Sequence, residues 1–155
     1  MDIDYGDTVL RLGAATAAGI AIGLNRDLQG KPMGMRTLAL VSLGAAAVTL
    51  SALQIDVLGS NPDALSRVVQ GVIQGIMAGI SFIGAGAVLR DYKSQSVTGL
   101  TTAATVWVAA ALGIACGLGA WVVAGLSTAI ALFVLVAVGW LERLGVRPDD
   151  DQKNK

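Results

Sequence analysis

Polar and charged side chains gather around the turns that separate the apolar segments of this sequence, and their chemistry is that of anion binding. The set is net positive, because it contains three arginines and one aspartate. It could receive an anionic lipid head group, a phosphate or an acidic loop of a partner protein. The alternative is a topology signal together with a structural Arg–Asp pair, since basic loops stay on the cytoplasmic side of a membrane. The set consists of Asn25, Arg26, Asp27, Arg36, Thr37, Arg90, Thr101 and Thr102.

A second polar set lies along one face of a single apolar segment, residues 68–89. At about 100° per residue, glycines, two glutamines and a serine fall on one half of a helix, and isoleucines fall on the other. We predict that the small and polar half is buried, either as a strip for helix packing or as the wall of a pathway. Gly84 and Gly86, beside Arg90, suggest an unwound turn near the end of this segment. The face consists of Gln70, Gly71, Gln74, Gly75, Gly79, Ser81 and Gly86.

Side chains for catalysis and metal binding are scarce. The chain contains no histidine and one cysteine, Cys116, which excludes intrachain disulfides, Cys/His zinc sites and histidine acid-base chemistry. All 11 acidic residues fall in expected loops or tails, so no expected span holds a carboxylate for Mg²⁺ or for a proton relay. We therefore expect no enzymatic activity and no cofactor. Mg²⁺ remains an option without an assigned ligand.

The composition is that of a membrane protein. Hydrophobic residues make up 54% of the 155 residues, charged residues 14%, and the mean hydropathy is +0.68. About a quarter of a soluble domain is charged, so this surface suits lipid. We predict an all-α integral membrane protein, a compact bundle of about five transmembrane helices in one domain, 1–141, followed by a short polar tail, 142–155. The helices are expected at 8–24, 37–55, 68–89, 98–116 and 120–141.

The distribution of basic residues predicts the orientation of the helices. With the N-terminus outside and the C-terminus in the cytoplasm, only Arg11 and Arg67 of the 11 basic residues lie outside. The net charge of zero gives no support for nucleic acid as a partner. Segment 120–141 is bulky and expected at the periphery, whereas Trp107, near mid-membrane, is expected to point into the bundle. A homodimer across a glycine strip is favoured over other oligomers.

Four different motifs follow one another along the chain, within a match that covers about residues 8–119. They are Gly23-Leu24-x-Arg26, Gly34-x-Arg36-Thr37, Gly79-Ile80-x-Phe82-Ile83-Gly84-Ala85-Gly86-x₃-Arg90 and Val97-x-Gly99-Leu100-Thr101-Thr102-Ala103-Ala104. Together they resemble the MgtC/SapB family of bacterial inner-membrane proteins. The family usually has a glutamate where this chain has Asn25, so a carboxylate role there would fall to Asp27. We expect Arg36 and Arg90 to have roles beyond topology.

The resemblance implies a multi-pass protein of the bacterial inner membrane, associated with adaptation to low magnesium, ion homeostasis and virulence. Some members are linked to inhibition of the proton-translocating ATP synthase, which implies a regulatory protein that binds a larger membrane complex. The alternative is a small transporter or channel for Mg²⁺ or another ion, which the lack of expected intramembrane carboxylates disfavours. Longer members carry a cytosolic C-terminal domain of ferredoxin-like type, and we expect this chain to comprise the transmembrane part alone.

Overall fold

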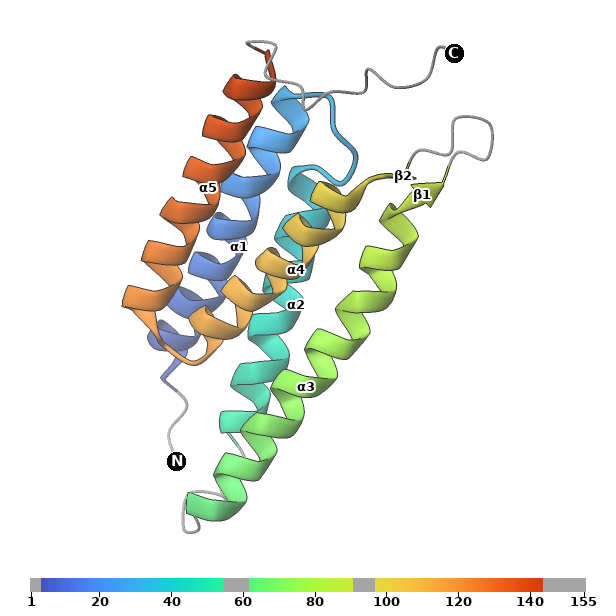
Figure 1. Ribbon diagram of the computed structural model, residues 1–155. Helices are drawn as coiled ribbons and strands as arrows, with labels where there is room; N and C mark the ends of the chain where they lie inside the picture. The colour runs from blue at the N-terminus through green and yellow to red at the C-terminus, as the bar shows by residue number, and fades with distance from the viewer. Residues whose placement is uncertain (1–3, 55–61, 91–96, 144–155) are drawn as a thin grey trace, which may run out of the picture.

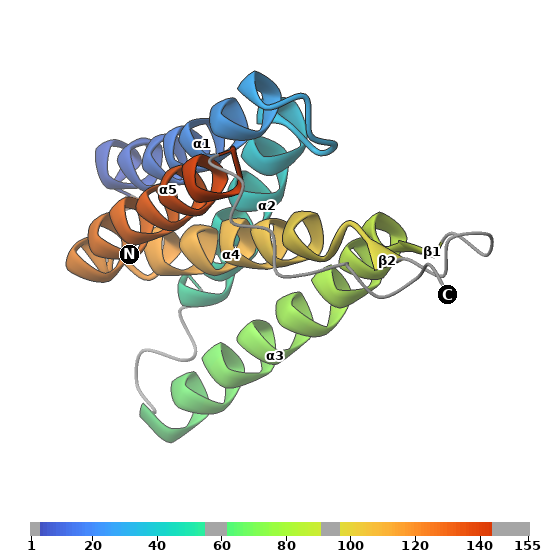
Figure 2. The same ribbon diagram turned by 45° about the horizontal axis from the view of Figure 1, so that its top comes forward.

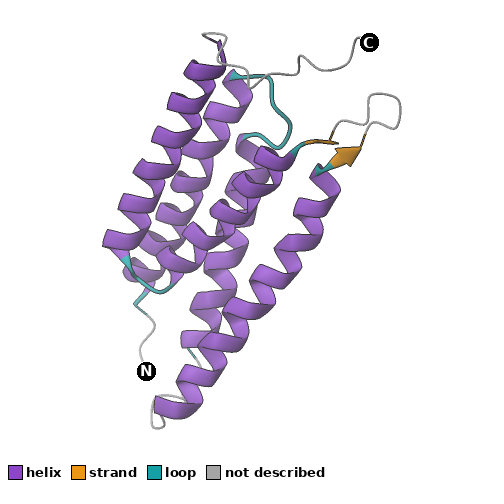
Figure 3. Ribbon diagram, viewed as in Figure 1, coloured by secondary structure: helices purple, strands orange, loops and turns teal. Residues whose placement is uncertain are grey.

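The computed structural model describes residues 4–54, 62–90 and 97–143. Five helices make up nearly all of this part (Figures 1 and 3), and each is long and apolar enough to cross a membrane. Two short strands pair antiparallel, with Leu89 opposite Thr98. The predicted helical membrane fold is therefore confirmed, and the orientation of the termini stays a prediction. The elements are α1 (Tyr5–Leu28), α2 (Met35–Leu53), α3 (Pro62–Ala87), β1 (Leu89–Arg90), β2 (Val97–Thr98), α4 (Leu100–Gly117) and α5 (Trp121–Arg143).

α1 is longer than expected because both of its ends are stabilised locally. The Asp4 carboxylate accepts hydrogen bonds from two backbone N–H groups of the first turn, at 2.9 and 3.2 Å, and so caps the N-terminus. After the last turn, the chain reverses at Gly30, whose φ of +63° suits glycine. The helix ends at Leu28 rather than at residue 24. Arg26 therefore lies on a helix and not in a loop.

α3 runs without a break to Ala87, so the suggested unwound turn at Gly84 and Gly86 is wrong. Gly84 is buried against α4, and a Cβ placed on it would lie 3.6 Å from the Cβ of Ala103. A continuous helix also keeps its backbone hydrogen bonds satisfied where no water can replace them. The helix ends at Ala87, and one residue separates it from β1.

α4 is the most buried helix and lies between α1, α2 and α3 (Figure 2). Its close contact with α2 depends on small residues. A Cβ on Gly113 would lie 2.9 Å from the Cβ of Ala45 and would collide with the Ser42 carbonyl oxygen. α1 meets α2 in the same way, through Gly19 and Gly23. Transmembrane helices associate through such close packing, because lipid provides no hydrophobic driving force between them.

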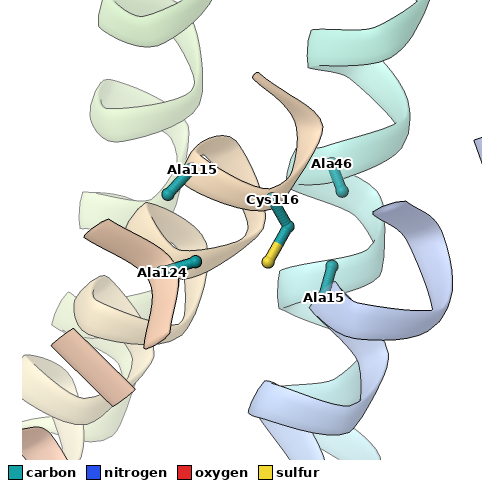
Figure 4. Close-up of a cluster of buried hydrophobic side chains, with 5 residues drawn as sticks. All are labelled: Ala15, Ala46, Ala115, Cys116 and Ala124. Atoms are coloured by element: carbon teal, nitrogen blue, oxygen red, sulfur yellow. The ribbon is translucent and has the colours of Figure 1, made fainter. Parts of the chain in front are cut away.

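A cluster of small side chains continues this packing to the C-terminal end of α4. Cys116 lies among alanines of α1, α2, α4 and α5 (Figure 4). At the next residue, a Cβ on Gly117 would lie 2.9 Å from the Ala46 carbonyl oxygen. Four helices therefore meet here without large side chains between them. The cluster consists of Ala15, Ala46, Ala115, Cys116 and Ala124.

α3 packs through its bulky face, so the predicted burial of its small and polar face within the chain is wrong. Isoleucines and Met77 of α3 contact the buried cores that α2 and α4 share. On the opposite face, a Cβ on any of the four exposed glycines would meet no atom within 4 Å. Apart from Gly84, large side chains fill the space between α3 and α4, because a strip of glycines there would leave voids. The exposed residues are Gln70, Gly71, Gln74, Gly75, Gly79, Ser81 and Gly86.

α5 lies at the periphery, as predicted, and most of its bulky side chains are exposed. The prediction for Trp107 is wrong, because 50% of its surface is exposed. Val106, Ala109 and Gly113 form the buried face of α4 instead. These smaller residues permit the close approach of α1 and α2, which an inward indole ring would prevent.

We predict that Gly113→Ala destabilises the fold by about 1–3 kcal/mol, because the added methyl group overpacks the contact between α2 and α4. Gly125→Ala on α5 is the matched control, since a Cβ there would meet no atom within 4 Å. The control should leave stability unchanged or raise it slightly through its higher helix propensity. Thermal unfolding of the purified variants in one detergent, followed by circular dichroism, checks the difference. Equal unfolding midpoints for both variants would contradict this packing.

Candidate functional site

A cavity of about 530 Å³ is lined by residues from the C-terminal parts of α1, α3 and α5 and from the N-terminal end of α4. These helix ends lie in the upper part of Figure 1. One wall is polar and comes from α1, the α1–α2 turn and the first turn of α4. The other wall is apolar and comes from α5. The residues that matter below are Arg26, Lys31, Thr101 and Thr102 on the polar wall and Val134, Leu135 and Val138 on the apolar wall.

Arg26 is the central residue of this cavity, because it is both charged and buried. Only 2% of its surface is exposed, and its Nη2 donates a hydrogen bond to the hydroxyl oxygen of Thr102, 76 residues further along the chain. Its Nε has no hydrogen-bond partner, and within residues 4–54, 62–90 and 97–143 its guanidinium forms no ion pair. A buried cation without an acidic partner is costly. Among the described residues, the positive charge of Arg26 is therefore uncompensated.

The N-terminus of α4 borders the same cavity without a side-chain cap. Gly99 is the cap residue, and its φ of +89° is one that glycine adopts without strain. A Cβ at this position would also collide with the Ala87 carbonyl oxygen, so the turn into α4 requires glycine. The first N–H groups of a helix have no intrahelical acceptor and carry the positive end of the helix dipole. The potential of α4 therefore adds to the charge of Arg26.

The polar neighbours of Arg26 on α1 make local hydrogen bonds. Asp27 Oδ2 accepts one from the backbone N–H of Met35 at 3.0 Å and so caps the start of α2. Asn25 Oδ1 accepts one from Gln29 Nε2 at 3.0 Å, one turn along the same helix. Neither Arg26 nor Arg36 forms an ion pair with Asp27, and the side chain of Arg90, the third arginine of the predicted set, lies outside the described residues. Asp27 therefore holds the α1–α2 turn and does not compensate the charge of Arg26.

The predicted cluster divides between two places. Arg36 and Thr37 line one end of a separate groove of about 570 Å³ between α2 and α3, and Arg36 is exposed. The backbone of Arg90 belongs to β1, while its side chain lies outside what the structure describes. The structure thus brings Arg26 together with the predicted threonines of α4 and separates Arg36 and Thr37 from them.

Lys31 and the α5 wall are absent from the site predicted from sequence. Lys31 follows Gly30 in a short turn, and this position next to the end of α1 is the signal that could have identified it. The α5 wall carries no such signal. In the sequence, Val134 and Val138 cannot be distinguished from valines that face lipid, and only the packing of α5 places them beside the cavity.

At the opposite end of α4, Arg11 occupies an electrostatically favourable position. Its Nη1 donates a hydrogen bond to the Gly117 carbonyl oxygen at 2.9 Å. Its Nε lies 2.7 Å from Asp7 Oδ2, in an ion pair rather than a hydrogen bond. A cation at a helix C-terminus interacts favourably with the helix dipole. Arg11 is thus compensated both by a carboxylate and by the helix end, whereas Arg26 has neither within the part of the chain that the structure describes.

The α3 face that could line a pathway lies on the outside of the chain. Ser81 donates its hydroxyl hydrogen to the Met77 carbonyl oxygen at 2.9 Å, within its own helix. Gln70 and Gln74 are exposed, and neither amide forms a hydrogen bond with another described residue. A pathway along this face would therefore need a second chain to enclose it.

The sequence model of the MgtC family matches residues 12–144 of this chain. SrpB of Synechococcus elongatus is 39% identical over 147 residues, which cover 91% of this chain and 80% of SrpB. MgtC of Salmonella typhimurium is 38% identical over 124 residues, which cover 80% of this chain and 49% of MgtC. The Escherichia coli protein named "Putative magnesium transporter YhiD" is 35% identical over 134 residues, which cover 82% of this chain and 58% of YhiD. No solved structure matches the chain.

We predict that Thr102→Val destabilises the fold by about 1–3 kcal/mol, because it removes the acceptor of the Arg26 hydrogen bond. Thr105→Val is the matched control. Thr105 is also buried on α4, but its hydroxyl donates a hydrogen bond to the Thr101 carbonyl oxygen of its own helix, at 2.6 Å. Loss of this hydrogen bond should lower the stability of the fold only slightly. Thermal unfolding in detergent measures both variants. A role for the Arg26–Thr102 contact is refuted if their midpoints coincide.

Proposed function

Because this chain belongs to the MgtC family, we propose that it is a regulatory protein that acts on a larger membrane complex, such as the proton-translocating ATP synthase, during adaptation to low magnesium. The chain is a multi-pass bacterial membrane protein, and the proposal places it in the inner membrane. Its role there is to bind partners and not to catalyse a reaction. In a pathogen, the same role would contribute to virulence.

The observation that carries the proposal is the open face of α3. Gln70 and Gln74 place amide groups within a helix that is apolar enough to span a membrane, where polar groups without hydrogen-bond partners cost free energy. Beside them, Gly71, Gly75 and Gly79 form a flat strip with open space above it. Another helix can pack closely on such a strip. A helix from a second protein would satisfy the amides and cover the glycines.

Two kinds of partner fit this face. A second copy of the chain fits because a glutamine amide both donates and accepts hydrogen bonds, so the face is complementary to itself across a two-fold axis. A transmembrane helix of a larger complex fits by the same chemistry. We propose that two copies pair through α3 and that a helix of the target complex takes the place of the second copy.

We predict that Gly75→Leu abolishes both kinds of association without unfolding the chain. A Cβ at Gly75 would meet no atom within 4 Å, so leucine fits the single chain but prevents close approach of another helix. The variant should lose copurification with the ATP synthase, and it should fail to support growth at low magnesium in a strain that depends on the protein.

Gly125→Leu is the control for this experiment, because Gly125 on α5 has equally open surroundings. It should keep copurification and growth at the level of the parent chain. If Gly75→Leu also keeps both, the α3 face is not the site of association and the proposal fails. Thermal unfolding of both variants establishes that each is folded.

A small Mg²⁺ transporter is the alternative, and the name of the relative YhiD is the observation that favours it. Mg²⁺ uptake into proteoliposomes tests this function, with Gln74→Leu and Arg90→Ala variants and empty liposomes alongside. We expect uptake no faster than in empty liposomes. The reason is that the acidic residues of the helices, such as Asp27 and Asp63, lie in terminal turns and away from the membrane centre. If the parent chain shows saturable Mg²⁺ uptake and both variants lose it, the chain is a transporter and the regulatory proposal fails.

A further inference from the structure

We propose that the cavity at the N-terminus of α4 binds a phosphate group, carried by an anionic lipid or present as free phosphate. The cavity measures about 530 Å³ and combines a cationic wall with an apolar one. This inference goes beyond the regulatory role, because it holds whichever complex the chain acts on.

The first argument is electrostatic. An arginine lies at each end of α4, and the helix dipole stabilises the charge of one and destabilises the charge of the other. Arg11 lies at the negative end, where it bonds the Gly117 carbonyl oxygen and pairs with Asp7. Arg26 lies at the positive end, where the dipole repels it and no carboxylate compensates it within the described part of the chain. An anion between Arg26 and the start of α4 would stabilise both at once.

The second argument is the unused donor of Arg26. Nη2 is taken by the Thr102 hydroxyl, whereas the buried Nε has no acceptor. With 2% of its surface exposed, Arg26 cannot satisfy this donor from bulk water. A guanidinium presents its N–H groups in a planar fork that matches the spacing of phosphate oxygens. An oxyanion in the cavity would therefore complete the hydrogen bonding of a buried group that the protein leaves incomplete.

Further donors converge on the same space. Lys31 lines the cavity from the α1–α2 turn and forms no ion pair with a described residue. Thr101, whose side chain carries a hydroxyl group, lines it from α4. The backbone N–H groups that follow Gly99 belong to a helix N-terminus, which is a common binding place for phosphate. No carboxylate occurs among the described residues that line the cavity, so its chemistry is that of an anion receptor.

The apolar wall distinguishes the two sources of the phosphate group. Val134, Leu135 and Val138 of α5 form this wall directly beside the cationic one. A lipid would place its phosphodiester against Arg26 and its glycerol and acyl chain along α5. Free phosphate would use the cationic wall alone. Both sources present the same oxyanion chemistry to Arg26 and Lys31, and the experiment separates them.

The test compares the full chain in three kinds of nanodisc: phosphatidylcholine alone, phosphatidylcholine with phosphatidylglycerol, and phosphatidylcholine with inorganic phosphate added to the buffer. A ligand that binds only the folded chain raises the unfolding midpoint. We expect at least one phosphate source to raise it by about 4 °C or more. Acetate at equal ionic strength serves as the anion control and should have no effect.

Lys31→Gln and Arg26→Gln should each weaken the binding by about tenfold or more, since each removes a charged hydrogen-bond donor. Lys31 is exposed, so its variant keeps the test independent of folding if Arg26→Gln does not fold. Arg36→Gln is the matched control. It removes an exposed arginine that lines the α2–α3 groove instead of this cavity, and it should bind like the parent chain.

Stabilisation by phosphatidylglycerol alone would identify a lipid ligand, and stabilisation by inorganic phosphate in neutral nanodiscs would identify the free anion. Either result supports the site if the Lys31→Gln variant loses the stabilisation and the Arg36→Gln variant keeps it. The proposal is overturned if neither source stabilises the chain beyond acetate. It is also overturned if Arg36→Gln weakens the response as much as Lys31→Gln, because general surface charge would then explain it.

Discussion

The close packing of α4 against α1 and α2 is the constraint on which the rest of the structure depends. Helices in lipid gain no hydrophobic free energy from meeting each other, so they need backbone approach and dense packing. Gly113 and Gly117 allow that approach on α4, and Gly19 and Gly23 allow it between α1 and α2. Once α4 is held among its neighbours, its two ends are placed beside the ends of the other helices, where the polar residues lie.

The charges follow from this position of α4. Arg11 meets the C-terminal carbonyl groups and a carboxylate, whereas Arg26 meets the N-terminal end and a hydroxyl. Within the described residues, the same residue type thus has a carboxylate partner at one end of α4 and none at the other. A buried charge that lines a cavity is the pattern expected of a binding site.

α3 contrasts with this core. Ile73, Ile76 and Ile80 reach the core, while both glutamines and all glycines of α3 except Gly84 face outward, the reverse of a helix that completes its packing within one chain. α5 also exposes much of its surface, but its exposed side chains are bulky and apolar and suit lipid without a partner. The two peripheral helices therefore differ in what can cover them. Lipid satisfies α5, and the polar strip of α3 is better satisfied by protein, which is the physical basis of the regulatory proposal.

The sequence by itself determined the class of fold, the number and order of the helices, and the gathering of polar residues near Arg26, because length, apolar composition and motif order are local properties. It located Arg26 and Thr102 but not their contact across 76 residues, which depends on how α1 crosses α4. It also could not orient α3 or Trp107. In a membrane protein both lipid-facing and protein-facing surfaces are apolar, so periodicity does not tell one from the other, and only the tertiary packing decides which face is buried.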